Sequence, residues 1–275
     1  MNLFDTENVR SPAVAGRFYP LDAEELRRTV SELLAVAAPP AGPSPKAIIA
    51  PHAGYSYSGP IAGSAYAQLV PARGIIRRIV LLGPAHRVAF EGLAVPSATA
   101  FATPLGLVPV DTESIGKLAS LPQVRVFDEA HGLEHSLEVH LPFLQVALEE
   151  FQVVPLAVGE ASPEDVARVL EALWGGPETR FVISSDLSHF HDSETARRLD
   201  RATAKAIEAL APEEVREDQA CGRIPITGLL LAARGRGLQA RTIDLRNSGD
   251  TAGPRDRVVG YGAFAFFEQA PLAGN

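Results

Sequence analysis

Cysteine is almost absent from this chain, which contains only Cys221 among its 275 residues. A single cysteine excludes an internal disulfide and is typical of proteins in a reducing compartment. Lysine is also scarce, because only three of the 25 basic residues are lysines. We interpret this scarcity as a bias of genome or growth temperature, without functional meaning.

The chain also lacks the long apolar segments that a membrane requires. No apolar run approaches the roughly 20 residues needed to span a bilayer, and no segment has the basic-then-apolar layout of a secretion signal. The formal net charge is −8, so neither nucleic acid nor an acidic membrane surface would be attracted to it. We therefore expect a soluble, cytoplasmic protein with no nucleic-acid partner and no membrane partner.

Several signatures of common enzyme classes are missing as well. The sequence contains no phosphate-binding loop, no Gly-x-Gly-x-x-Gly after a predicted strand and no Gly-x-Ser-x-Gly elbow. These absences argue against nucleotide-binding and serine-hydrolase chemistry of the familiar kinds. A nucleophilic Cys221 paired with a histidine stays open.

What is present is an alternation of strand and helix patterns. A helix is predicted to begin after Asp22, with Glu25 placed as in a capping box, and to end before the proline-rich connector at 38–45. The predicted strands then cover 46–50, 77–83, short segments within 91–110, 152–158, 180–185, 238–245 and 257–267, and the predicted helices cover 59–70, a segment capped by Ser162, 194–210 and 224–234. This alternation predicts an α/β fold.

The strand patterns also indicate how the sheet is built. Continuous apolar runs are typical of strands that are buried on both faces of a parallel sheet. We expect one layered domain over 1–275, with a mostly parallel central sheet flanked by helices. The N-terminal helix and connector, residues 1–45, are expected to pack on that core.

Two predicted strands run directly into a histidine. His52 follows the strand at 46–50 and His86 follows the strand at 77–83, both in turns that contain glycine and proline. In an open α/β sheet, ligands bind beyond the carboxyl ends of the strands. The two imidazoles therefore form a candidate metal site, although both turns could simply connect strands to helices. Tyr55, in the same turn as His52, is a candidate for the pocket wall.

A third strand end carries Asp186 and His189. A carboxylate near an imidazole fixes its tautomer and raises its basicity, so His189 is a candidate general acid or base oriented by Asp186. Helix capping would explain the aspartate but not the histidine.

The segment at 134–143 is dense in side chains that bind metals or substrates. Glu134, His135, Glu138 and His140 lie within seven consecutive residues, and we take all four as pocket candidates. The order and spacing differ from those of a zinc-protease helix. On a helix, His135 and Glu138 would share one face, as would Glu134 and Glu138.

Cys221 offers a third metal ligand. A lone cysteine is usually an inert small apolar residue, but its thiolate would complete a set of two histidines and one cysteine, which leaves coordination positions open. Iron-dependent oxygen chemistry more often uses a carboxylate in this place. Glu134, Glu138 and Asp186 are the candidates for that alternative.

These motifs, in this order, resemble the Memo family, whose prokaryotic members are also called AmmeMemoRadiSam system protein B. The matching motifs are PHAGYSYSG at 51–59, GPAH at 83–86, EHSLEVHLPF at 134–143, SSDLSH at 184–189 and CG at 221–222. The segment RSPAVAGRFYP at 10–20 resembles the N-terminal motif of the family, and GYG at 260–262 also fits. The resemblance covers nearly the whole chain.

The resemblance implies a fold and a set of roles. Memo proteins are similar in fold to LigB-type extradiol dioxygenases, which cleave catechol rings with non-haem Fe(II). By resemblance, His52 and His86 match the two histidine ligands, Cys221 matches the third ligand of Memo proteins, and His189 matches the acid/base histidine. The dioxygenases have glutamate where Cys221 stands. A thiolate is softer and favours copper(I) or zinc more than a carboxylate does, and it also binds iron.

From these residues we expect a metal-binding, dioxygenase-like protein that carries out redox chemistry on an unknown small molecule, with iron or copper as the ion and zinc as the alternative. A second hypothesis is a non-catalytic scaffold that binds a peptide or protein in a vestigial pocket. A third is catechol ring cleavage with a nearby glutamate in place of Cys221. The resemblance also implies AMMECR-type and radical SAM proteins as pathway partners.

Overall fold

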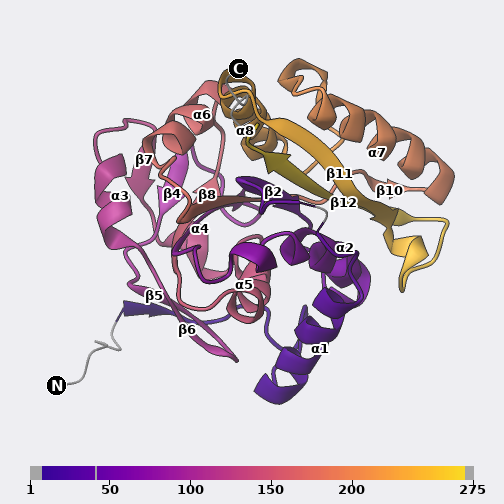
Figure 1. Ribbon diagram of the computed structural model, residues 1–275, viewed down its shortest axis with the longest axis horizontal. Helices are drawn as coiled ribbons and strands as arrows, with labels where there is room; N and C mark the ends of the chain where they lie inside the picture. Colours follow the sequence, from indigo (N-terminus) through magenta and orange to yellow (C-terminus); the bar gives the residue numbers. More distant parts are fainter. Residues whose placement is uncertain (1–7, 41, 270–275) are drawn as a thin grey trace, which may run out of the picture.

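The computed structural model describes residues 8–40 and 42–269. The ends of the expected domain, 1–7 and 270–275, and Ala41 of the expected connector lie outside the described residues. In the described part, a central sheet separates two layers of helices (Figure 1). This arrangement confirms the predicted α/β class.

The central sheet has nine strands in the order β10-β12-β2-β9-β3-β8-β4-β7, with β11 paired to β12. Their bounds are β2 Ala47–Ala50, β3 Arg78–Pro84, β4 Leu93–Val95, β7 Val124–Val126, β8 Gln152–Val158, β9 Thr179–Ser184, β10 His189–His191, β11 Gln239–Asn247 and β12 Val258–Phe267. The four central strands β2, β9, β3 and β8 are parallel. Antiparallel pairs flank them on both sides, so the sheet as a whole is mixed.

A smaller sheet holds the N-terminal segment. It consists of β1 Val9–Arg10, β5 Ala100–Thr103 and β6 Gly106–Pro109, in the order β1-β5-β6. β1 runs parallel to β5, and β5 and β6 form an antiparallel hairpin. The pairing of β1 with β5 therefore anchors the start of the segment that follows β1.

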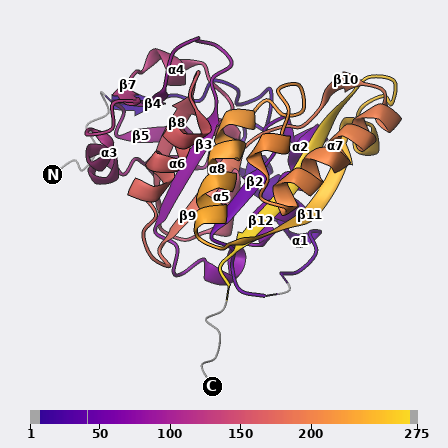
Figure 2. The ribbon, with the colours of Figure 1, turned by 90° about the horizontal axis from the view of Figure 1, so that it is seen from above.

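Helices cover both faces of the central sheet, as Figures 1 and 2 show. Their bounds are α1 Ala23–Ala35, α2 Tyr55–Ala67, α3 Thr112–Leu118, α4 Glu129–Gly132, α5 Leu141–Ala147, α6 Pro163–Ala172, α7 Ser193–Glu208 and α8 Arg223–Gly235. α1, α2 and α5 lie on one face, and α6, α7 and α8 lie on the other. None of the helices in the described ranges has the length and apolarity that a bilayer crossing demands.

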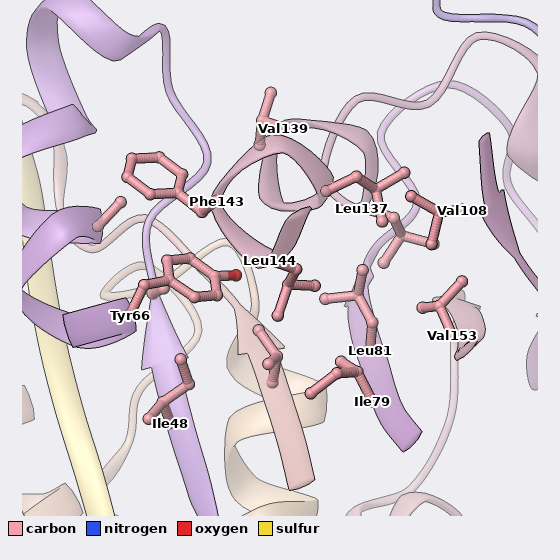
Figure 3. Packing of buried hydrophobic residues seen from close by; sticks show 14 of the residues in the cluster. Ile48, Tyr66, Ile79, Leu81, Val108, Leu137, Val139, Phe143, Leu144 and Val153 are labelled. Carbon is pink, nitrogen blue, oxygen red and sulfur yellow. The ribbon is translucent and has the colours of Figure 1, made fainter. Parts of the chain in front are cut away.

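The strands alternate their side chains between two hydrophobic clusters. Ile48 and Leu81 face the cluster under α1, α2 and α5 (Figure 3), whereas Ile49 and Leu82 face the cluster under α6, α7 and α8. All four side chains are completely buried. Burial on both faces explains why these strands have continuous apolar sequences, since neither face meets water.

The predicted elements agree with the structure in most places. β8 has the predicted bounds, and Ser162 and Asp165 form a reciprocal capping box at the start of α6. The helix predicted at 59–70 begins at Tyr55 instead. Its first helical hydrogen bond runs from the Ser58 amide to the Gly54 carbonyl, at 3.0 Å. This earlier start brings α2 within three residues of His52.

Candidate metal site

The carboxyl ends of three neighbouring strands carry the residues that the sequence pointed to. β2, β9 and β3 are adjacent and parallel, so the segments that follow them meet at one edge of the sheet. His52 follows β2, His86 follows β3, and Asp186 and His189 follow β9. Residues from three separate parts of the chain thus reach one edge.

Three imidazoles at this edge could hold one metal ion. The ligand atoms of His52, His86 and His135 all lie within 4.8 Å of one another. His135 reaches the edge from the turn after α4, and its ring stacks on His86 with centroids 4.8 Å apart. Sequence reasoning placed His135 only among the pocket candidates, so the structure adds it to the residues that could bind a metal.

A chain of hydrogen bonds sets the tautomer of His52. The Ser184 hydroxyl donates to the Ser136 carbonyl at 2.6 Å, so its oxygen is left to accept from the Nδ1–H of His52, also at 2.6 Å. Burial, followed by the neighbouring His86 and His135, lowers the pKa of His52 well below its usual value. His52 is therefore a neutral imidazole with its lone pair on Nε2, the form that binds metals.

Glu134 sets the tautomer of His86 in the same way. Its Oε1 lies 3.0 Å from Nδ1 of His86, and the carboxylate also accepts from the backbone amides of His86, His135 and Ser136. Burial opposes ionisation of Glu134, but its hydrogen bonds to His86 and to these amides bring its pKa down to about 2. An ionised carboxylate only accepts, so Nδ1 of His86 carries a proton and Nε2 is the ring nitrogen that can bind a metal.

Cys221 lies beside His52, outside the group of three histidines whose ligand atoms meet within 4.8 Å. Its Sγ is 3.4 Å from Nε2 of His52 and accepts from the Asp186 amide at 3.3 Å. Gly222 permits this approach, because a Cβ at that position would lie 2.5 Å from the Ser184 carbonyl oxygen. Burial, and then the charge of Asp186, raise the pKa of the Cys221 thiol to about 12. The thiol is therefore protonated at neutral pH unless a cation binds it.

A cavity of about 450 Å³ opens beside Cys221. Its walls come from the ends of β3 and β8 and from the start of α8, and they include Ala85, Phe90, Gly159 and Arg223. This volume is within the range of small-molecule sites. A small molecule could therefore reach the sulfur.

The Asp186 carboxylate binds the backbone of His52. Its Oδ1 accepts from the His52 amide at 2.8 Å, and no hydrogen bond joins it to His189 within the residues that the structure describes. Burial raises the pKa of Asp186, while the His52 amide and the nearby His189 act in the opposite direction. The expected orientation of His189 by Asp186 therefore has no hydrogen bond behind it in the described residues.

The segment at 134–143 is not one helix, so the helical arrangement considered for it is wrong. Only Glu138–His140, a 3-10 turn, and α5 are helical, and the residues before Glu138 form turns. Glu134 faces His86, whereas Glu138 accepts from Arg10 and Tyr19. The two glutamates consequently serve different partners and share no face.

The remaining two pocket candidates form buried hydrogen bonds. The Tyr55 hydroxyl donates to the Val139 carbonyl at 2.6 Å, and Nδ1 of His140 lies 2.7 Å from the Tyr66 hydroxyl. Burial, followed by His52, lowers the pKa of His140 well below its usual value. Both residues are buried.

Two residues that hydrogen-bond to the site segments, Ser184 and Arg10, were not among the predicted site residues. Ser184 is the last residue of β9 and belongs to the SSDLSH motif, so its position at a strand end was a usable signal. Arg10 lies in the N-terminal motif, but nothing in its local sequence indicates a contact with Glu138, 128 residues away.

An α/β sheet whose carboxyl edge gathers imidazoles and a thiol defines a candidate metal-binding protein. The family model described as Memo-like protein matches residues 10–265. The chain therefore belongs to the Memo family, as its motifs predicted. A MEMO1 family protein of Aquifex aeolicus is 39% identical over 264 residues, covering 92% of this chain and 97% of that protein. One of Methanopyrus kandleri is 34% identical over 281 residues, with 94% and 98% covered.

The fold is also found in a solved structure. An uncharacterized protein of Escherichia coli K12 has a similar fold with a TM-score of 0.51 and 16% sequence identity, covering 78% of this chain and 98% of that chain. At this identity, the likeness concerns the fold alone.

Proposed function

We propose that the protein binds one transition-metal ion through His52, His86 and Cys221. The observation that carries the proposal is that Nδ1 of both histidines is hydrogen-bonded to an acceptor, so that Nε2 is the ring nitrogen on each that can bind an ion. Metal-binding histidines almost always donate their other ring N–H to a carboxylate or another acceptor. A histidine with only a structural role needs neither a fixed Nδ1 proton nor an Nε2 lone pair that can reach an ion.

The donor set fits a soft or borderline metal. Two imidazoles and a thiolate suit copper, iron and zinc better than they suit magnesium or calcium. We propose iron or copper as the ion, with zinc as the alternative. Three protein ligands leave positions open for water, oxygen or substrate. His135 belongs to the same cluster and is the alternative third ligand.

The proposed activity is that of a non-haem, metal-dependent oxidoreductase, dioxygenase-like, acting on a small molecule. The bound ion would supply redox and Lewis-acid chemistry. His189 would hold or transfer a proton at a ring nitrogen, with the Asp186 carboxyl near it. Asp186 also fixes the backbone of His52. The AMMECR-type and radical SAM partners stay predictions.

Metal analysis tests this proposal. The wild-type chain is purified anaerobically without a chelating tag and compared with His52→Ala and Cys221→Ser by elemental analysis. His191→Ala is the matched control, because His191 lies in β10 and is not part of the histidine cluster. We expect about one metal per chain in the wild type and the control, and a large loss in the other two. Equal metal content in all four proteins would refute the proposed site.

A further inference from the structure

The N-terminal strap, defined here as residues 10–19, is bonded to the loop that carries the site. The Arg10 guanidinium donates to the Glu138 carboxylate, to the Glu134 carbonyl at 2.6 Å and to the His131 carbonyl at 3.1 Å. Arg10 and Glu138 are both buried. One side chain therefore ties together the start, the middle and the end of the loop at 131–138.

Glu138 holds the strap at further points. Besides Arg10, its carboxylate accepts from the amides of Ala13 at 2.7 Å and Val14 at 3.0 Å, and from the Tyr19 hydroxyl at 2.6 Å. Its two oxygens thus accept four hydrogen bonds. This number fills the capacity of a carboxylate, so the position of the strap relative to the loop is closely defined.

The strap also contacts the two segments that bear the histidines. The ring of Phe18 packs edge-on against His135, with centroids 4.9 Å apart. The Phe18 carbonyl accepts from the Tyr55 amide at 2.7 Å, three residues after His52. A shift of the strap would therefore be transmitted to both sides of the histidine cluster.

The ion pair between Arg10 and Glu138 is better explained by the geometry it gives the loop at 131–138 than by its contribution to stability. The cost of removing two charges from water largely offsets their attraction, and buried ion pairs often contribute little net stability compared with apolar residues of similar volume. The planar, five-donor guanidinium is suited to binding one carboxylate and two carbonyls at fixed angles. The two carbonyls belong to His131 and to Glu134, whose side chain orients His86.

We infer that Arg10 and Glu138 are positioning residues of the metal site: they hold the loop at 131–138 so that Glu134 and His135 face His86. This inference rests on the proposed metal-binding function. Arg10 does not touch the ion in this role. It acts through the backbone of Glu134.

Zn²⁺ affinity, measured by competition with a chromophoric chelator, tests the inference. Arg10→Lys keeps the charge beside Glu138 but loses the fork that reaches two carbonyls. Lys46→Met is the matched control, because Lys46 is also a buried cation that donates to backbone carbonyls, those of Trp174, Gly176 and Thr179, next to the start of β2. We expect Arg10→Lys to weaken Zn²⁺ binding about 10- to 100-fold, as supporting-shell changes do. Lys46→Met should lower the melting temperature but keep wild-type affinity.

A spectrum separates positioning from general loss of structure. The Co²⁺-loaded Arg10→Lys protein should show altered ligand-field and thiolate charge-transfer bands at a temperature where it is fully folded, and Lys46→Met should not. If Arg10→Lys does not fold, Tyr19→Phe replaces it. Loss of that one hydrogen bond to Glu138 should weaken Zn²⁺ binding about fivefold.

The outcomes distinguish the two proposals. A wild-type chain that binds no Zn²⁺ and no Co²⁺ would overturn the proposed metal site itself. If Arg10→Lys and Tyr19→Phe keep the wild-type Zn²⁺ affinity and Co²⁺ spectrum, only the positioning role of Arg10 and Glu138 is overturned. An equal loss of Zn²⁺ affinity in Lys46→Met would overturn it as well.

Discussion

Replacing Ser184 with alanine tests the hydrogen-bond chain that orients His52. The Ser184 hydroxyl is the only group that the structure places within hydrogen-bond reach of both the Ser136 carbonyl and Nδ1 of His52. Ser184→Ala leaves two buried groups without partners, at about 1–3 kcal/mol each. We therefore expect the free energy of unfolding to fall by about 2–6 kcal/mol.

The effect on metal binding is the more specific part of this prediction. Without its acceptor, His52 can rotate or change tautomer, and we expect metal affinity to fall about 10- to 100-fold. That range corresponds to about 1.4–2.7 kcal/mol of binding free energy. Ser184→Thr keeps the hydroxyl and should keep most of the affinity.

The assay is Zn²⁺ titration against a competing chelator, with urea unfolding of the same samples. Ser114→Ala is the control, because Ser114 is also completely buried and its hydroxyl donates to Asp111 at 2.7 Å in α3, away from the site. It should lose stability but not affinity. Full affinity in Ser184→Ala, despite lost stability, would refute the reasoning.

Three further predictions follow from the same contacts. His189→Ala should keep wild-type metal content in elemental analysis, because His189 is proposed to move a proton and not to bind the ion; loss of metal would contradict that role. Gly83→Ala should lower both stability and Zn²⁺ affinity, since a Cβ there would lie 2.7 Å from Oγ of Ser136; unchanged values would show that the loop moves freely. Burial raises the pKa of Asp200 to about 6, so the folded state binds its proton more tightly than the unfolded state, and the stability that Asp200 contributes is lost as pH rises from about 4 to about 6. Asp200→Asn should remove up to about 3 kcal/mol of that pH dependence in urea unfolding between pH 4 and 7, and an unchanged slope would contradict it.

Local patterns predicted the parts of the fold that depend on local physics. β8 is a continuous apolar strand with ordinary bounds, and α6 begins at a serine followed by proline, so both could be recognised without any tertiary information. The parallel core followed from strands that are apolar on both faces. A strand was predicted where β12 lies, but its antiparallel pairing with β2 and β11 has no signal in the local sequence.

Strand topology alone predicted which residues converge only where those residues follow strands. His52 and His86 follow buried strands, so their convergence could be expected from topology. The position of the turn that carries His135 could not be expected from topology, because the shape of this turn depends on three hydrogen bonds that the Glu134 carboxylate accepts from backbone amides. The anchoring of Glu138 by Arg10 depends on a contact between distant parts of the chain, which no sequence window contains.

The most direct test of the central claim is X-ray absorption spectroscopy at the metal edge of the anaerobically purified protein. We expect nitrogen scatterers from His52 and His86 together with one sulfur scatterer, and loss of the sulfur in Cys221→Ser. A spectrum with only nitrogen and oxygen neighbours, unchanged in Cys221→Ser, would contradict the proposed ligands and would favour His135 as the third ligand.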